Sequence, residues 1–122
     1  MMQINTKEAN QVRNNVALYC RVDSGGTPED LKLAASLQKT KLERYAKKYN
    51  LYVVACYEDI GFTGNDFFRP GFNAMLTDCA KGLFETVLVV NRSRLFRGNF
   101  KTQSTCPFKV ISLDDLNRQP VL

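Results

Sequence analysis

Two short apolar runs in the two halves of the chain most strongly constrain its fold. Residues 16–22 (VALYCRV) and 86–90 (TVLVV) are rich in β-branched and apolar side chains and show no regular polar alternation. This pattern is typical of strands that are buried on both faces of a parallel sheet. Residues 52–57 and 110–113 are also apolar, and we expect them to form two further strands.

Two helical patterns separate these strands. Thr27 and Pro28 are typical of an N-cap and a first helical position, and the pattern predicts a helix from Pro28 to about residue 48, with Gln38 as a polar exception on its inward face. A second helix is predicted over residues 70–81, closed by Gly82, after a glycine-bearing loop over residues 59–66. Strands that alternate with helices indicate an α/β fold. We therefore predict a mainly parallel sheet of four or five strands, flanked by helices.

The length and composition indicate one domain. The 122 residues, 44% of them hydrophobic, can bury a single core. We expect a polar N-terminal lead over residues 1–15, one α/β domain over residues 16–115 and a tail over residues 116–122.

The formal net charge of +5 favours a polyanionic partner, although many small domains carry such a charge for solubility alone. No apolar stretch approaches the length of a membrane span, and the lead is too polar for a signal peptide, so we expect a cytoplasmic protein that does not contact membranes.

The spacing of the cysteines and the lack of histidine limit the kinds of metal site and catalytic site that the chain can form. Cys20, Cys56, Cys79 and Cys106 are scattered, no two of them form a CxxC pair, and the chain has no histidine. We interpret the four thiols as buried small hydrophobic groups rather than a zinc site or a disulfide framework. We expect neither a metal nor a cofactor. Any catalysis would then depend on Arg, Asp, Glu, Ser, Tyr or Lys.

Arginines follow the two central apolar runs. Arg21 lies at the end of the first run, and Arg94 and Arg97 follow the third predicted strand. The carboxyl ends of parallel strands share one edge of a sheet, so these arginines should converge there. Guanidinium groups bind phosphate in a forked geometry, which points to phosphodiester chemistry. The structural alternative is an exposed pair, Arg94 and Arg97, on a short helical turn.

Five short segments occur along the chain in a fixed order. They are YCR at residues 19–21, QK at 38–39, GFTG at 61–64, RPGF at 69–72 and SRLFR at 93–97. In this order they resemble the catalytic domain of the resolvase/invertase serine recombinases, and in particular the large recombinases of mobile elements. The resemblance covers residues 16–98, about two thirds of the chain.

The resemblance implies site-specific DNA strand exchange, in which a serine attacks the scissile phosphate and forms a covalent phosphoserine link. Arginines stabilise the charge of such a displacement without a metal. By position, the active-site arginines would be Arg21, Arg69, Arg94 and Arg97, and the active-site glutamine would be Gln38. The structural alternatives are a solvated residue before a helix for Arg69, and an amide at the edge of the core, bonded to a loop, for Gln38.

Three departures from the family pattern affect the expected activity. Asp23 stands at the position of the nucleophilic serine, and Ser24 follows one residue later. Ser93 stands where many relatives carry an aspartate. Relatives also continue into a long dimerising helix and a DNA-binding region, so we expect a C-terminally truncated form of the domain.

Three hypotheses follow from these departures. The first is a degenerate, inactive catalytic domain that binds DNA weakly and without sequence preference, and the second is an active recombinase fragment that uses Ser24 as nucleophile. The third is a protein-binding regulator or inhibitor of a nucleic-acid enzyme, which reuses the recombinase fold. We expect binding rather than catalysis, with DNA or a nucleic-acid-processing protein as partner, and homo-oligomers are compatible with the family.

Overall fold

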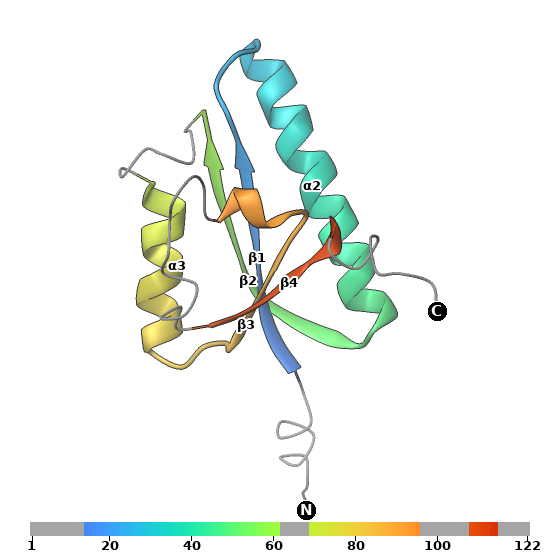
Figure 1. Ribbon diagram of the computed structural model, residues 1–122, viewed down its shortest axis with the longest axis vertical. Helices are drawn as coiled ribbons and strands as arrows, with labels where there is room; N and C mark the ends of the chain where they lie inside the picture. The colour runs from blue at the N-terminus through green and yellow to red at the C-terminus, as the bar shows by residue number, and fades with distance from the viewer. Residues whose placement is uncertain (1–13, 62–68, 96–107, 115–122) are drawn as a thin grey trace, which may run out of the picture.

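The computed structural model describes residues 14–61, 69–95 and 108–114, which form an α/β fold (Figure 1). The elements in chain order are β1 (Asn14–Val22), α2 (Pro28–Lys48), β2 (Leu51–Ile60), α3 (Pro70–Ala80), β3 (Thr86–Val89), the 3-10 turn η1 (Arg92–Arg94) and β4 (Lys109–Ser112). The strands make one four-stranded sheet in the order β2-β1-β3-β4, and every neighbouring pair is parallel. The predicted fold class is therefore confirmed, with four strands among the described residues.

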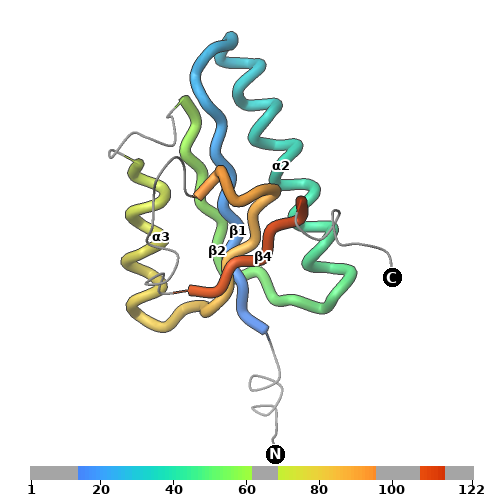
Figure 2. The backbone as a smooth tube through the Cα atoms, in the orientation of Figure 1, coloured from blue at the N-terminus to red at the C-terminus, as the bar shows by residue number. Residues whose placement is uncertain are grey.

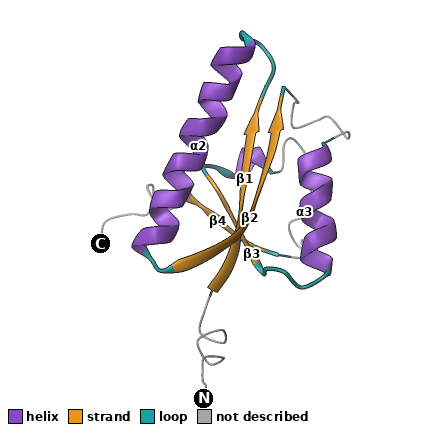
Figure 3. Ribbon diagram, turned by 180° about the vertical axis from the view of Figure 1, so that it is seen from behind, coloured by secondary structure: helices purple, strands orange, loops and turns teal. Residues whose placement is uncertain are grey.

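The two helices flank the sheet on opposite sides, as Figures 1 and 3 show from front and back. The backbone trace in Figure 2 follows α2 as it returns the chain from the end of β1 to the start of β2. Both helices begin with the predicted signals, because Pro28 and Pro70 occupy first-turn positions and the Thr27 hydroxyl accepts a hydrogen bond of 3.0 Å from the Asp30 amide.

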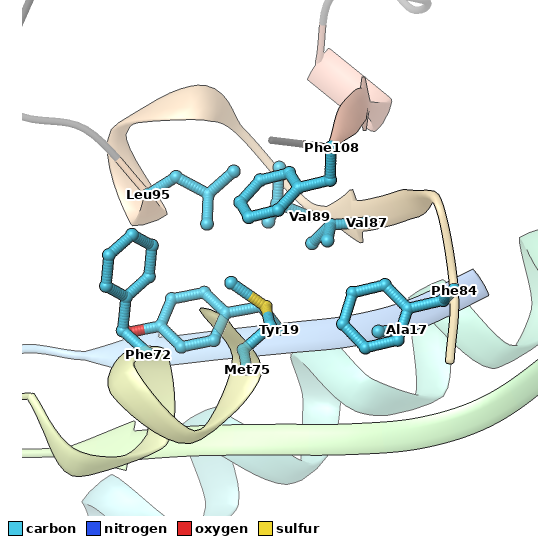
Figure 4. Close-up of a cluster of buried hydrophobic side chains, with 9 residues drawn as sticks. All are labelled: Ala17, Tyr19, Phe72, Met75, Phe84, Val87, Val89, Leu95 and Phe108. Carbon is cyan, nitrogen blue, oxygen red and sulfur yellow. The ribbon is translucent and has the colours of Figure 1, made fainter. Parts of the chain in front are cut away.

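Alternate residues of β1 supply two cores. Ala17 and Tyr19 pack on the α3 side with Phe72 and Met75, and Figure 4 shows this cluster. Val16, Leu18 and Cys20 pack on the other side with Leu42 and Ala46 of α2. All the side chains of β1 from Val16 onward are buried, so the two-faced burial predicted from the unbroken apolar run is confirmed.

Several boundaries and one burial assignment differ from the sequence predictions. β1 begins at Asn14, two residues earlier than predicted, because Asn14 and Asn15 pair with Leu51 and Tyr52 of β2. β2 runs on to Ile60, so the expected loop does not begin at Asp59, and residues 62–68 lie outside the described residues. The expectation that all thiols are buried is confirmed for Cys20 but was wrong for Cys56, which is exposed because β2 is an edge strand, and Cys79 is only half-buried. Cys106 lies outside the described residues.

None of the helices in the described ranges combines the length and the apolar character that a membrane span requires.

Candidate active site

The carboxyl end of β1 and the turn η1 hold two arginines in direct contact. The Arg21 Nε atom donates a hydrogen bond of 3.0 Å to the carbonyl oxygen of Arg94, and the Arg94 Nη1 atom donates one of 3.1 Å to the carbonyl oxygen of Arg21. This reciprocal pair joins the end of β1 to the segment after β3. The structure thus brings together two of the three arginines that the strand pattern predicts to converge, while Arg97 lies outside the described residues.

Arg21 is enclosed by its acceptors. Its side chain is only 1% exposed, and its Nη2 atom donates to the carbonyl oxygen of Ser93. Its Nη1 atom forms an ion pair with the carboxylate of Asp23, which is 39% exposed. Burial lowers the pKa of Arg21, and the Asp23 carboxylate opposes that change by favouring the charged form. A buried guanidinium requires such acceptors, so Asp23 provides the counter-charge of this site.

Gln38 fixes the backbone of the same residue. Its Nε2 atom donates a hydrogen bond of 2.9 Å to the Arg21 carbonyl oxygen, and its Oε1 atom accepts one of 3.3 Å from the Arg21 amide. The amide side chain therefore pairs with the end of β1 as a neighbouring strand would. This contact explains a glutamine on the inward face of α2, where it binds the strand itself rather than a loop.

Arg69 is a buried cation at the N-terminus of α3. Its side chain is 4% exposed, so the alternative interpretation of Arg69 as a solvated residue before a helix was wrong. Its Nη1 atom donates to the carbonyl oxygen of Leu95 and its Nη2 atom to that of Arg94, both at 3.0 Å. Its guanidinium carbon lies 4.2 Å from the centre of the Phe72 ring, within range of a cation–π contact. Arg69 therefore holds the segment after η1 against α3.

Tyr19 and Asp59 complete this network, and the sequence predictions did not place them in the site. The Tyr19 hydroxyl donates a hydrogen bond of 2.6 Å to the Asp59 carboxylate and accepts one of 3.0 Å from Arg69. Burial, together with the Asp59 hydrogen bond, raises the pKa of Tyr19, so the phenol keeps its proton. The available signal was the position of Tyr19, two residues before Arg21 on the same face of β1.

Asp59 also joins β2 to α3. Its carboxylate, 1% exposed, accepts hydrogen bonds of 2.7 Å from the Gly71 amide and 2.9 Å from the Phe72 amide. These amides belong to the first turn of α3, where a carboxylate satisfies free N–H groups and the helix dipole. The buried negative charge is balanced by hydrogen-bond donors and, through Tyr19, by Arg69.

Ser24 stands apart from this network. It is exposed in the loop between β1 and α2, directly before Gly25, whose φ of +126° is a conformation that favours glycine.

The cluster formed by Arg21, Gln38, Arg69 and Arg94 is hereafter called the arginine cluster. It supplies positively charged groups at one edge of the sheet, and Asp23 is the carboxylate in ion-pair contact with Arg21.

Comparison with known proteins gives consistent results. The family described as "Resolvase, N terminal domain" matches residues 16–107. A predicted DNA recombinase of Bacillus subtilis (strain 168) is 32% identical over 82 residues, which are 67% of this chain but only 16% of that relative.

Solved structures of similar chains have the same fold. The N-terminal catalytic domain of TP901-1 integrase is 27% identical with a TM-score of 0.70, and the match covers 84% of this chain and 79% of that one. A resolvase family site-specific recombinase from Streptococcus pneumoniae is also 27% identical, with a TM-score of 0.68 over 84% of this chain and 74% of that one.

Proposed function

The chain belongs to the resolvase family of serine recombinases, and on this basis we propose that it is a recombinase-type catalytic domain that binds DNA phosphates without cleaving DNA. The observation that carries the proposal is the ion pair between Arg21 and Asp23. It places a carboxylate beside the guanidinium at the end of β1, at the position that the family resemblance gives to the nucleophile.

The Arg21–Asp23 ion pair is unsuited to the chemistry of DNA strand cleavage. Attack on a phosphodiester requires an oxygen nucleophile in line with the leaving group and positive surroundings for the developing charge. The Asp23 carboxylate repels the phosphate and also satisfies one Arg21 donor that a phosphate would need. Ser24 is one residue beyond this position, exposed in the loop after β1, and forms no contact with the arginine cluster among the interactions of the described residues.

The positive charge of the arginine cluster supports DNA binding. The described network around the guanidiniums of Arg21, Arg69 and Arg94 includes two carboxylates: Asp23, which is paired with Arg21, and Asp59, which is linked to Arg69 through the Tyr19 hydroxyl. Together with the net charge of +5, this favours contact with a polyanion through counterion release. Contacts of this kind are made to phosphates and not to base edges, so the binding should be weak and independent of sequence.

A covalent-adduct assay tests the catalytic half of the proposal. The protein is incubated with supercoiled DNA and with a nicked substrate that traps covalent intermediates, and the products are separated under denaturing conditions. We expect no protein–DNA adduct. An adduct mapped to Ser24 by mass spectrometry would overturn the proposal and establish an active recombinase that uses Ser24.

Fluorescence anisotropy with a short labelled duplex tests the binding half. We expect binding at low salt that weakens steeply as salt is raised and does not depend on the DNA sequence. The absence of binding at low salt would overturn this part and favour the protein-binding regulator or inhibitor.

A further inference from the structure

A second concentration of positive charge lies outside the arginine cluster. The C-terminal half of α2 lines one wall of an open cleft of about 310 Å³ with Lys41, Arg44, Tyr45 and Lys48. The three cations are spaced three and four residues apart and therefore lie on one face of the helix. All three are exposed, whereas Tyr45 is half-buried. This surface is hereafter called the basic cleft.

The opposite wall of the basic cleft comes from the ends of two strands. It consists of Val90 after β3 and of Leu113 and Asp114 after β4. The Asp114 amide donates a hydrogen bond of 2.9 Å to the Val90 carbonyl oxygen, which holds the two segments together. Figures 1 and 3 both place the end of β4 beside α2. The cleft thus has a fixed backbone wall facing a row of cations.

The charges of the cleft are not explained by the stability of the helix. Basic residues in the last turn favour a helix through its dipole, which accounts for Lys48 but not for Lys41 or Arg44, because the effect fades beyond that turn. Among the residues that the structure describes, no carboxylate forms an ion pair with any of the three cations. Of the described residues that line the cleft, only Asp114 is acidic. The surface is therefore suited to a ligand that carries several negative charges.

One wall of the basic cleft, formed by the segments after β3 and β4, lies at the carboxyl edge of the sheet, where the arginine cluster also lies. Val90 lines the cleft and lies four residues before Arg94, so the two Cα atoms are at most about 14 Å apart. One DNA strand carries a phosphate for about every 3.4 Å of duplex axis. A DNA strand that contacts the arginine cluster would therefore reach the strand wall of the cleft within half a helical turn, and the cations of α2 form the opposite wall.

We propose that the basic cleft is a second binding site for DNA phosphates, continuous with the arginine cluster along the carboxyl edge of the sheet. The identity of the ligand rests on the proposed function, whereas the site rests on the geometry of α2 and the ends of β3 and β4. Lys41, Arg44 and Lys48 contact successive phosphates. The Tyr45 ring provides an apolar surface for the adjoining sugar.

Charge-matched variants test this site. The triple variant Lys41→Ala/Arg44→Ala/Lys48→Ala is compared with Lys32→Ala/Lys39→Ala/Lys47→Ala, whose residues lie on the same helix but do not line the cleft. Each variant removes three positive charges from a chain of net charge +5. We expect the cleft variant to flatten the slope of log affinity against log salt by about 2 to 3, and the control to flatten it by less than about 1. Equal losses in the two variants would overturn the proposal.

Amide chemical shifts of the unmodified protein give a second test that needs no variant to fold. On titration with a short duplex of arbitrary sequence, we expect the amides of Tyr45, Lys48 and Asp114 to shift together with those of Arg21 and Arg94. Shifts at the arginines alone would overturn the cleft site and leave the proposed function standing. Shifts at the cleft alone would support the cleft and overturn the arginine cluster as a DNA site, whereas no shift at either would overturn both.

A peptide of glutamates is titrated in parallel as a second polyanion. We expect it to shift the cleft amides less than DNA at equal charge concentration. Cleft shifts with the peptide and none with DNA would overturn the proposal and assign the cleft to an acidic protein partner.

Discussion

At the scale of single residues, Arg21 shows how a buried cation determines what surrounds it. A guanidinium that is 1% exposed loses hydration, and each donor left without an acceptor would cost free energy. Two of its acceptors are backbone carbonyl oxygens, of Ser93 and Arg94, and are therefore independent of side-chain identity. The third is the Asp23 carboxylate, the one acceptor in this set that a substitution can remove.

Replacing Asp23 with serine should therefore strengthen DNA binding. In Asp23→Ser, the Arg21 Nη1 atom becomes available to a phosphate and one repelling charge is lost, worth about 1 kcal/mol at a partly exposed site, or about fivefold in affinity. The salt slope should steepen by about 1, because one further phosphate contact forms. Both are measured by fluorescence anisotropy over a series of salt concentrations.

The matched control for this prediction is Glu29→Ser. Glu29 is exposed in the first turn of α2, so this variant changes the net charge equally and leaves the Arg21 contacts intact. We expect its affinity to change less than twofold. A similar gain in both variants would mean that Asp23 acts only through net charge and that Arg21 does not contact DNA.

Local sequence accounts for part of this site. The meeting of Arg21 with Arg94 follows from topology alone, because Arg21 lies at the carboxyl end of β1, Arg94 follows β3, and the two strands are parallel neighbours. Arg69 and Gln38 entered the candidate site only through the family resemblance. Tyr19 was not foreseen because a tyrosine within an apolar run resembles any core residue, and its hydrogen-bond partner Asp59 lies 40 residues away. Such a partnership is set by the register of β1 and β2, which no local pattern encodes.

At the scale of elements, the approach of α3 to the end of β2 depends on a missing side chain. A Cβ atom on Gly71 would lie 2.5 Å from the Glu58 carbonyl oxygen and 3.0 Å from the Asp59 carboxylate. The helix can come this close only because residue 71 has no side chain. The same approach lets the Asp59 carboxylate reach the Gly71 and Phe72 amides.

The variant Gly71→Ala should therefore destabilise the fold. The added methyl group has to displace backbone rather than a flexible side chain, and the displacement lengthens the Asp59 hydrogen bonds. We expect a loss of about 2 to 3 kcal/mol in the free energy of unfolding, measured by urea denaturation. In the control Gly26→Ala, the nearest atom to the new Cβ is the Asp30 Cβ at 3.4 Å, and we expect a change within about 1 kcal/mol. Equal changes in the two variants would show that the close approach is not what Gly71 provides.

The elements themselves were largely predictable, and their ends less so. The helix starts at Pro28 and Pro70 carry local signals, since proline suits the first turn. The end of β2 has no such signal, because Asp59 and Ile60 extend the strand through pairing with Arg21 and Val22 of β1. The exposure of Cys56 likewise depends on strand order, which places β2 at the edge of the sheet.

At the scale of the whole molecule, the residues that form the cores and the residues proposed to bind DNA lie on different parts of the sheet. The two cores occupy its two faces, whereas the arginine cluster and one wall of the basic cleft lie at its carboxyl edge. In open parallel sheets this edge is the usual position for ligands. Substitutions of the exposed cations of the basic cleft, Lys41, Arg44 and Lys48, should therefore change DNA affinity more than they change the stability of the fold.

A final prediction tests whether that edge, rather than the overall positive charge, binds DNA. The double variant Arg94→Ala/Arg97→Ala includes Arg97 because the sequence predicts it at the same edge. It should flatten the slope of log affinity against log salt by about 2, because each lost phosphate contact removes about 0.9 from the slope. Lys32→Ala/Lys47→Ala removes the same charge from the outer surface of α2 and should change the slope by less than about 0.5. The conservative pair Arg94→Lys/Arg97→Lys keeps both charges and should retain most of the slope. If the alanine and control variants flatten the slope equally, DNA is attracted by net charge alone, and the carboxyl edge has no special part in binding.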